Sequence, residues 1–490
     1  MNRIKSAAII LVMAACLTGC AGMPENMSSS DELPCIIPDF TDISIPSNIA
    51  PLNFSADGGK ARTVTLFEYG DNQSVIRGRD IRITRRKWRK MLDSGTIKVT
   101  VCQKRDNGGW ISYRPFTWTV SDPVDRYVSY RLIPPSFRQY EEIILAQRDL
   151  STFRERAFYR NSLVQKPAKG LGQCVNCHHF QNWSAENMQF HIRQYEGGTM
   201  LVTNGEPRLV HTERENGISA GVYPAWHPRL PLIAYSTNNT QQAFHTLHQN
   251  HIEVFDVESD LILYDIEHDS VCNIISTPDR MECFPNWSPD GRTLFFVSAL
   301  PGEEIMNGGD VTALYNTIRY DLYSKSFDPD TRSWGETKLL YSASADSSSV
   351  TLPRVSPDGR HLMFARGGYG VFQIWHDDAD LWMMDLCDST MRPLDELNSN
   401  YAESNHSWSH DGRWVIFGTR REDAAFTRLY LSHMEEDGTF TKPFPIPQRD
   451  PHSNVLRLFS YNVPEFTTDR IGISPRRFAR ISGGNQRKRK

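Results

Sequence analysis

The sequence has no long apolar run and almost no excess of charge of one sign. Its 490 residues include 54 lysines and arginines against 58 aspartates and glutamates, which leaves a formal net charge of −4. Because binding to nucleic acid relies on clustered positive charge, this balance gives no reason to expect a nucleic-acid partner. The apolar run from Ala7 to Met13 is shorter than the ~20 residues that a helix needs to span a bilayer. No later stretch is more apolar over a greater length, so no membrane-spanning helix is predicted.

The first twenty residues are typical of a secretory signal. Arg3 and Lys5 precede the apolar run, and small residues follow it up to Cys20. The ending LTGC resembles the bacterial lipobox, and this resemblance implies that Cys20 is acylated and becomes the mature N-terminus. An ordinary signal peptide or a short membrane anchor is the alternative. The small, polar segment after Cys20 is typical of a flexible tether.

These features predict a lipoprotein signal peptide at 1–19 and a lipidated tether at 20–35. Removing 1–19 would take the formal net charge to about −6. We expect the protein in the cell envelope, anchored by lipid alone, at the outer membrane and facing the periplasm or the cell surface.

Cysteine is scarce, with nine residues in the whole chain. Cys16 and Cys20 belong to the signal and the lipidation site, and an odd number of thiols remains for the rest of the protein. An exported protein meets an oxidising compartment, where disulfides form and haem can be attached to thiols. Cys272 and Cys283 could bridge neighbouring strands or remain as buried free thiols.

Four segments of the chain align with one another. They begin at Tyr223, Phe284, Leu352 and Asn405, and each is followed by a second piece of alternating apolar residues. In three of them an Asp-Gly pair precedes an alternating strand, which is typical of a tight turn between two strands. Each such sheet is too small to bury its own faces, so the copies must pack against one another. The repeats therefore predict the blades of a β-propeller.

The repeat W-S-P-D-G-R, with a downstream D-L-W or D-L-Y, resembles the repeats of TolB-like propellers over residues 220–450. The resemblance implies about six blades, and we expect between five and seven. A partial fifth copy begins at Tyr461, and the hairpin at 198–212 could pair with that tail to close the ring.

The remaining regions complete a mainly β fold. Alternating residues at 36–120 predict a small β-sandwich-like domain. A helix-period stretch after Pro135 predicts a short helical linker at 121–185, and the propeller is then expected at 186–482. A basic tail at 483–490 ends the chain.

A C-x-x-C-H motif falls inside the expected linker. In this motif Cys174 and Cys177 could form thioethers to a c-type haem, with His178 as the ligand of the iron. A disulfide or redox-active pair, a metal site and an inert pair are the alternatives. A zinc ion would need ligands from elsewhere, for which the candidates are His245, His248 and His251.

A second haem ligand is expected just downstream. Ser184 could N-cap a helix that would place Met188 and His191 three residues apart on one face. His191 is the first choice for this ligand, and Met188 is the second.

The segments CVNCHHF, YPAWHP, IEVFDVESDL and LILYD together resemble a group of lipoproteins from the Bacteroides lineage. In that group a TolB-like propeller follows a C-x-x-C-H segment, and members are labelled TolB-like or cytochrome c biosynthesis proteins. The resemblance covers about residues 130–470. It implies the fold and the motif but no settled activity.

The sequence assembles no complete catalytic set, so we expect a binding scaffold rather than an enzyme. In this hypothesis the propeller rim binds another protein or a cell-envelope polymer. A haem-dependent role in electron transfer or redox sensing is the second hypothesis. A sugar-binding or glycoside-acting propeller is the third, because Asp256, Asp260 and Asp265 lie close together in the sequence.

Overall fold

The computed structural model describes residues 22–56, 62–106, 108–134, 142–166, 170–245, 252–306 and 309–484. They divide into two compact units. Cys20, His248 and His251 lie outside the described residues, as do the predicted signal peptide and most of the basic tail. Among the described helices, none has both the length and the apolar character needed to cross a membrane.

The first unit comprises residues up to 47, together with 51–121 and 447–455. One sheet has the strand order β1 (Met27–Ser29), β9 (Trp110–Ser112), β8 (Thr96–Lys104), β10 (Phe116–Ser121) and β3 (Ile43–Pro46), and β8 also pairs with the hairpin β5 (Thr63–Tyr69) and β6 (Asn72–Arg77). A smaller sheet joins β2 (Ile36–Ile37), β4 (Phe54–Ala56) and β7 (Asp80–Ile81), and α2 spans Arg85–Leu92.

The core of this unit forms around Trp118. Its indole is fully buried, donates to the Phe40 carbonyl at 2.7 Å, and meets Trp88 edge to face. The β content agrees with the sequence prediction, but the return of 447–455 was not predicted. That segment is held by Asn53, whose side-chain amide donates to the Arg449 carbonyl at 3.0 Å.

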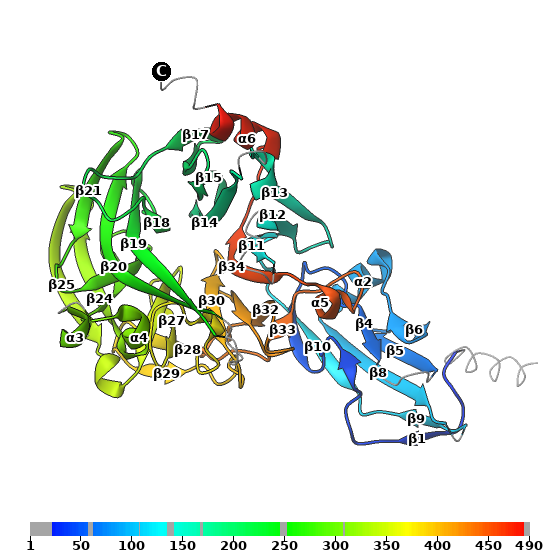
Figure 1. Ribbon diagram of the computed structural model, residues 1–490. Coiled ribbons are helices and arrows are strands. Elements are labelled where there is room, and N and C mark those ends of the chain that lie inside the picture. The colour runs from blue at the N-terminus through cyan, green and yellow to red at the C-terminus, as the bar shows by residue number, and fades with distance from the viewer. Residues whose placement is uncertain are drawn as a thin grey trace, which may run out of the picture. The chain divides into compact units, whose positions relative to one another are not determined.

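The second unit contains six four-stranded sheets among its described residues (Figure 1). They are β14 (Gln173–Gln181), β15 (Ser184–Gln194), β16 (Gly198–Thr203), β17 (Glu206–Val210); β18 (Val222–Trp226), β19 (Leu232–Phe244), β20 (Ile252–Asp265), β21 (Ser270–Ile275); β22 (Met281–Trp287), β23 (Thr293–Ala299), β24 (Tyr320–Asp328), β25 (Ser333–Tyr341); β26 (Ser349–Val355), β27 (His361–Gly367), β28 (Asp380–Asp385), β29 (Met391–Pro393); β30 (Glu403–Trp408), β31 (Trp414–Thr419), β32 (Arg428–His433), β33 (Phe444–Pro445); and β34 (Ser460–Thr467), β11 (Tyr127–Ile133), β12 (Ile144–Asp149), β13 (Glu155–Arg160). Short helices lie between strands: η2 (Asn161–Leu163), α3 (Glu303–Met306), α4 (Val311–Leu314), η4 (Tyr315–Thr317), η5 (Ser344–Asp346) and η6 (Gln373–Trp375). The helix α5 (Ser453–Leu456) lies at the end of the returning segment 447–455, and α6 (Pro475–Gly483) follows β34.

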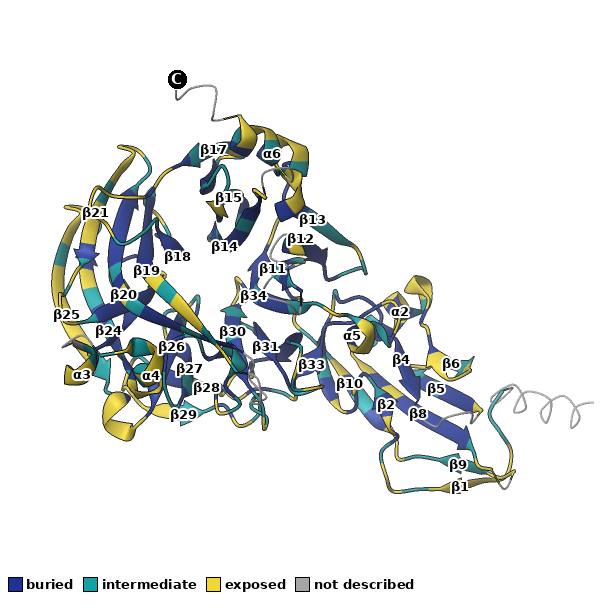
Figure 2. Ribbon diagram, in the orientation of Figure 1, coloured by how far each residue is buried: buried dark blue, intermediate teal, exposed yellow. Residues whose placement is uncertain are grey.

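The six sheets close into a ring. Their first strands contact one another in the cyclic order β14, β18, β22, β26, β30, β34 and back to β14. The outer strands β21 and β25 are largely exposed, whereas the strands nearer the axis are buried (Figure 2). The protein is therefore a six-bladed β-propeller, within the predicted range.

The sixth blade combines both ends of the unit. Its first strand is the C-terminal β34, which pairs antiparallel with β11. Strands β12 and β13 complete it, and η2 is a single turn, so the predicted helical linker is wrong over its described residues. Here Val128, Tyr130 and Leu132 are buried at alternate positions, which is the period of a strand. The hairpin at 198–212 pairs with β15 and not with the C-terminal tail.

Each first strand carries a β-bulge at the same position. One residue in each first strand has a positive φ between 47° and 54°: Cys177, Tyr223, Phe284, Leu352, Asn405 and Val463. Four of these residues are the first residues of the aligned repeats. The C-x-x-C-H motif is therefore the first strand of a blade, and the sequence alignment missed it because His178 stands where three repeats have proline.

The glycine and the tryptophan of the repeats each have a structural role in the blades. Gly291, Gly359 and Gly412 adopt φ angles between 71° and 75°, as the Asp-Gly pairs predict. The indole of Trp287 donates to the Ala225 carbonyl of the preceding blade at 3.1 Å, and Trp408 does the same with Arg354. The tryptophan of the repeat thus joins neighbouring blades.

Candidate functional site

A cavity of about 350 Å³ opens on the ring axis, and all six blades contribute to it. Its wall contains the residue three positions after each bulge: Phe180, Trp226, Trp287, Val355, Trp408 and Phe466. Five of these six side chains are aromatic. We call this space the axial cavity.

Polar groups lie between the aromatic rings. Nδ1 of His179 lies 2.9 Å from Oε1 of Glu465. Burial alone would raise the pKa of Glu465, but His179 and the nearby Arg354 outweigh it and hold that pKa below its usual value. The indole nitrogen of Trp226 is buried without a hydrogen-bond partner. The axial cavity therefore offers aromatic faces together with hydrogen-bonding groups.

Cys174 and Cys177 lie on the innermost strand β14 and are free, partly exposed thiols. In a regular strand, residues three apart would point to opposite faces, but the bulge at Cys177 changes this alternation. Cys174 is paired in register with Arg193 of β15. Burial raises the pKa of the Cys177 thiol, so Cys177 is protonated near pH 7.

His178 is 2% exposed. Its ring hydrogen-bonds the Ser129 backbone, and its Nε2 is buried without a hydrogen-bond partner. Burial lowers the pKa of His178 to about 4, so the imidazole is neutral at pH 7. A neutral histidine that donates from one ring nitrogen and leaves the other free has the arrangement of a metal ligand. Two thiols and a neutral imidazole are the donor types that a c-type haem requires.

Met188 and His191 lie on a strand and not on the predicted helix. They therefore face opposite sides of β15. Met188 is fully buried in an apolar cluster with Phe180 and Phe190. His191 is on the side of Arg193; its Nδ1 lies 3.1 Å from the Thr199 hydroxyl, and burial lowers its pKa to about 3. His191 therefore lies on the face of β15 that carries Arg193, whereas Met188 belongs to the apolar cluster against which Cys174 also packs.

A long hairpin crosses the other end of the ring axis (Figure 1). It is made by β19 and β20, which continue well beyond their blade. Glu253 on β20 lies 3.0 Å from Nε2 of His376 and accepts from the Tyr369 hydroxyl, and Phe255 stacks on Tyr315. These partners belong to other blades, so the hairpin spans the face of the propeller.

A second cavity of about 340 Å³ lies at this end. Its lining includes Ile252 of the hairpin, Ile133 and Asn462 of the sixth blade, and Trp375 and Phe426 from other blades. We call it the covered cavity.

Asp256 is a buried residue of the hairpin strand β20. Its carboxylate accepts from the Asn238 amide at 2.7 Å and from the Thr240 hydroxyl at 2.9 Å, and burial raises its pKa to about 7. Asp260 and Asp265 do not converge with it. All three lie along the single strand β20, where nine residues span about 30 Å. The three carboxylates therefore do not form one site, and the sugar-binding alternative gains no support from them.

Asp256 makes stability depend on pH. Its pKa is raised in the folded state, so between about pH 4 and pH 7 the unfolded state releases its proton first and the free energy of unfolding falls as pH rises, by about 4 kcal/mol. Asp256→Asn, which keeps an acceptor oxygen, is expected to remove most of this fall. Denaturant unfolding of both proteins across this range measures it, with the exposed Asp279→Asn as control. Parallel pH profiles for Asp256→Asn and the parent would contradict this assignment.

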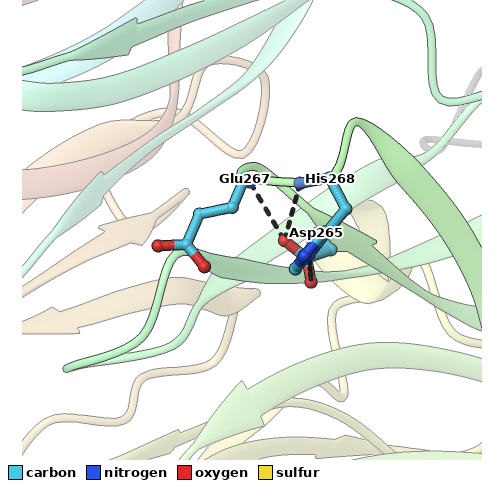
Figure 3. A group of neighbouring side chains, drawn as sticks. All are labelled: Asp265, Glu267 and His268. Carbon is cyan, nitrogen blue, oxygen red and sulfur yellow. Dashed lines mark hydrogen bonds and ion pairs between the residues drawn. The ribbon is translucent and has the colours of Figure 1, made fainter.

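Among the described residues, one surface group has possible ligand atoms close enough together to hold a cation. Asp265, Glu267 and His268 lie together in the turn after β20 (Figure 3). Asp265 accepts from the backbone N–H groups of Glu267 and His268, and Arg332 pairs with both carboxylates. The hydrogen bonds and the arginine account for this cluster as a stabilised turn.

The other cysteine and histidine predictions have these outcomes. Cys272 is an exposed free thiol on β21, and Cys283 is a buried free thiol on β22, so the two form no disulfide. His245 lies by the Tyr315 hydroxyl, with its Nε2 at 3.2 Å, and its proposed zinc partners lie outside the described residues.

No family model and no curated protein matches this chain. Among solved structures it is similar to TolB from Acinetobacter baumannii, at 13% identity over 75% of this chain and 79% of that chain, with a TM-score of 0.41. It is also similar to hydrazine synthase from Kuenenia stuttgartiensis, at 11% identity over 66% of this chain and 47% of that chain, with a TM-score of 0.40. The chain thus spans less than half of that synthase chain. The β-propeller predicted from the sequence is confirmed by the six four-stranded sheets and their cyclic order.

Proposed function

We propose that this protein is a lipid-anchored scaffold of the cell envelope whose propeller binds a protein or an envelope polymer at the axial cavity. The observation that carries the proposal is the cavity itself. All six blades line it, and five of the six repeated positions at its wall are aromatic. Aromatic faces beside hydrogen-bonding groups suit a peptide segment or a sugar chain.

Site-specific crosslinking tests this binding. Pro289 is exposed and lines the axial cavity, and Lys338 is exposed on the outer strand β25. A photoreactive phenylalanine analogue at position 289 is expected to form a discrete adduct in intact cells, whereas the same analogue at 338 is not. Ser407→Trp, which fills the cavity, should abolish the adduct at 289. Equal adducts at both positions, or an adduct that survives Ser407→Trp, would exclude the cavity as the binding site.

The tether of this proposal rests on the lipobox at Cys20. Cys20→Ser is expected to shift the protein from the membrane fraction to the soluble fraction and to leave its melting temperature unchanged, because the proposed tether is the lipid on that cysteine. Labelled palmitate incorporation and fractionation measure the change. Cys16→Ser is the matched control and should remain in the membrane. Palmitate label retained by Cys20→Ser would count against lipidation at this residue.

A second candidate function is that of a haem protein active in electron transfer or redox sensing. Two observations favour it: the thiols of Cys174 and Cys177 are free, and Nε2 of His178 is buried without a partner. Cys174 and Cys177 would hold the haem covalently, and His178 would ligate its iron. When bound, a c-type haem supplies one-electron chemistry. Intact mass and a visible spectrum of protein made with the cytochrome maturation machinery test whether the group is attached.

A further inference from the structure

A short segment of the first unit carries a dense positive charge. From position 77 to position 90 the chain has eight lysines and arginines and a single acidic residue, Asp80. The basic residues are Arg77, Arg79, Arg82, Arg85, Arg86, Lys87, Arg89 and Lys90. We call 77–90 the basic segment. The formal net charge of −4 for the whole chain therefore hides a strong local excess of positive charge.

The basic segment lies on the surface of its unit. It includes the end of β6, the short strand β7 and most of α2. Seven of its eight basic residues are exposed, and Lys87 is half-buried. Trp88 and Met91 are the buried residues of α2, and Trp88 packs edge to face on Trp118 in the core. The rest of the helix surface is therefore free to present its charges outward (Figure 2).

Little within the described part of the protein neutralises these charges. Arg79 lies 3.6 Å from Asp80, whose carboxylate also accepts from the Ser55 hydroxyl at 2.8 Å. No carboxylate of the described residues forms an ion pair with the five basic residues of α2. Three of those five occupy the first turn, where the helix dipole favours acidic side chains. The folded protein therefore retains a repulsion that an external anionic partner would relieve.

The proposed lipidation site is joined to this segment by a very short stretch of chain. Arg77 donates from Nη2 to the Gly22 carbonyl at 2.6 Å. Gly22 follows Cys20 by two residues, which span at most about 7 Å of chain. A few residues further on, β1 pairs with β9 of the same unit. An acyl group on Cys20 would therefore hold the end of β6 close to the lipid headgroups.

The helix α2 lies beside the hairpin to which this anchored end belongs. A Cβ atom at Gly70, in the turn before β6, would lie 3.9 Å from the Cβ of Ser94, which follows α2. The basic segment thus leaves the hairpin at one end of β6, and α2 leads back to its other end about 17 Å away (Figure 1). The charges of α2 and the anchored end of β6 therefore lie near one another on this unit.

We propose that the basic segment docks on the anionic phospholipid headgroups of the membrane that holds the anchor. The inference rests on the proposed lipid anchor and adds to it the surface of the protein that faces the membrane. Acyl chains and a basic surface act together in stable membrane attachment. Each lysine or arginine close to an anionic bilayer strengthens binding by about fivefold.

Vesicle sedimentation tests the docking without the anchor. The sample is the chain made without residues 1–19 and with Cys20→Ser, which carries no acyl group. It should bind vesicles that contain phosphatidylglycerol and not vesicles of pure phosphatidylcholine, and salt should weaken this binding because it screens charge. The glutamine variant, which combines Arg85→Gln, Arg86→Gln and Arg89→Gln, should bind about a hundredfold more weakly.

Two matched variants separate this surface from the charge of the whole protein. Arg292→Gln, Lys338→Gln and Arg360→Gln together remove the same charge from exposed sites of the propeller, and this protein should bind as the parent does. Exchange of the three α2 arginines for lysine keeps the charge and should also preserve binding, because attraction to headgroups does not need the planar guanidinium. The glutamine variant should melt no lower than the parent, since it relieves repulsion at the start of α2.

Parent protein that binds both kinds of vesicle equally, or neither, would overturn the proposal, as would a lysine variant that binds as weakly as the glutamine variant. Binding to polyphosphate in solution without binding to vesicles would assign the basic segment to a soluble polyanion instead. None of these measurements depends on acylation. A failure of docking is therefore distinct from a failure of the anchor, which palmitate labelling of the full chain measures.

Discussion

A protein truncated after Phe459 is expected to lose the cooperative unfolding of its propeller. The deletion removes β34, which is the first strand of the sixth blade and the only strand that joins β11 to the axis. It leaves β11 with an open edge, and the first strands β14 and β30 lose their shared neighbour. The returning segment 447–455 of the other unit is kept, so the deletion acts on the ring alone.

The size of this effect follows from the buried side chains that are lost. Tyr461, Phe466, Ile471, Ile473 and Phe478 are all buried. At about 1.5 to 3 kcal/mol each, their burial contributes about 10 kcal/mol, which is as large as the whole stability of a typical domain. Hydrogen bonds from Gln147 to Thr467 and from Arg131 to Asn462 are lost as well.

Near-UV circular dichroism and calorimetry measure the loss. Truncation after Gly484 is the matched control, since it removes only residues 485–490 and should melt like the parent. If the protein truncated after Phe459 melted within about 2 °C of the parent, β34 would not close the ring.

The propeller could be predicted from the sequence because each of three repeats contains the Asp-Gly pair that forms its turn. The turn needs a residue that tolerates positive φ, and the contact between blades needs the tryptophan. Both residue types therefore recur along the sequence. The blade that contains β14 escaped detection because Cys177-His178-His179-Phe180 has neither the proline nor the Asp-Gly turn that each occur in three of the four aligned copies. The aromatic residue three positions after the bulge is the signal that could have found it.

Other features could not be predicted because they depend on pairing between distant residues. β12 and β13 were assigned to a helical linker, since a short apolar run does not separate strand from helix until its partners are known.

The haem hypothesis predicts one outcome for the two cysteines of the motif and another for its histidine. Replacing both Cys174 and Cys177 by alanine should abolish peroxidase stain after denaturing electrophoresis, because thioethers survive denaturation and coordination does not. His178→Ala should keep the stain and change the visible spectrum, because an axial ligand tunes the iron without holding the porphyrin covalently. His406→Ala is the control for the loss of a buried histidine, because His406 occupies the same position of β30 as His178 does of β14. It should leave both the stain and the visible spectrum unchanged.

The structure also separates the two candidates for the second ligand. His191 lies on the side of β15 that carries Arg193, so His191→Ala should alter the reduced spectrum while the stain persists. Met188 is packed among Phe180 and Phe190 on the opposite side, so Met188→Leu should lower stability by less than about 1.5 kcal/mol and leave the spectrum unchanged. A spectrum that responds to Met188→Leu but not to His191→Ala would reverse this order. If protein made with the maturation machinery carries no added haem mass and the two thiols are found joined, the pair is a disulfide on the innermost strand of its blade, and the scaffold function stands alone.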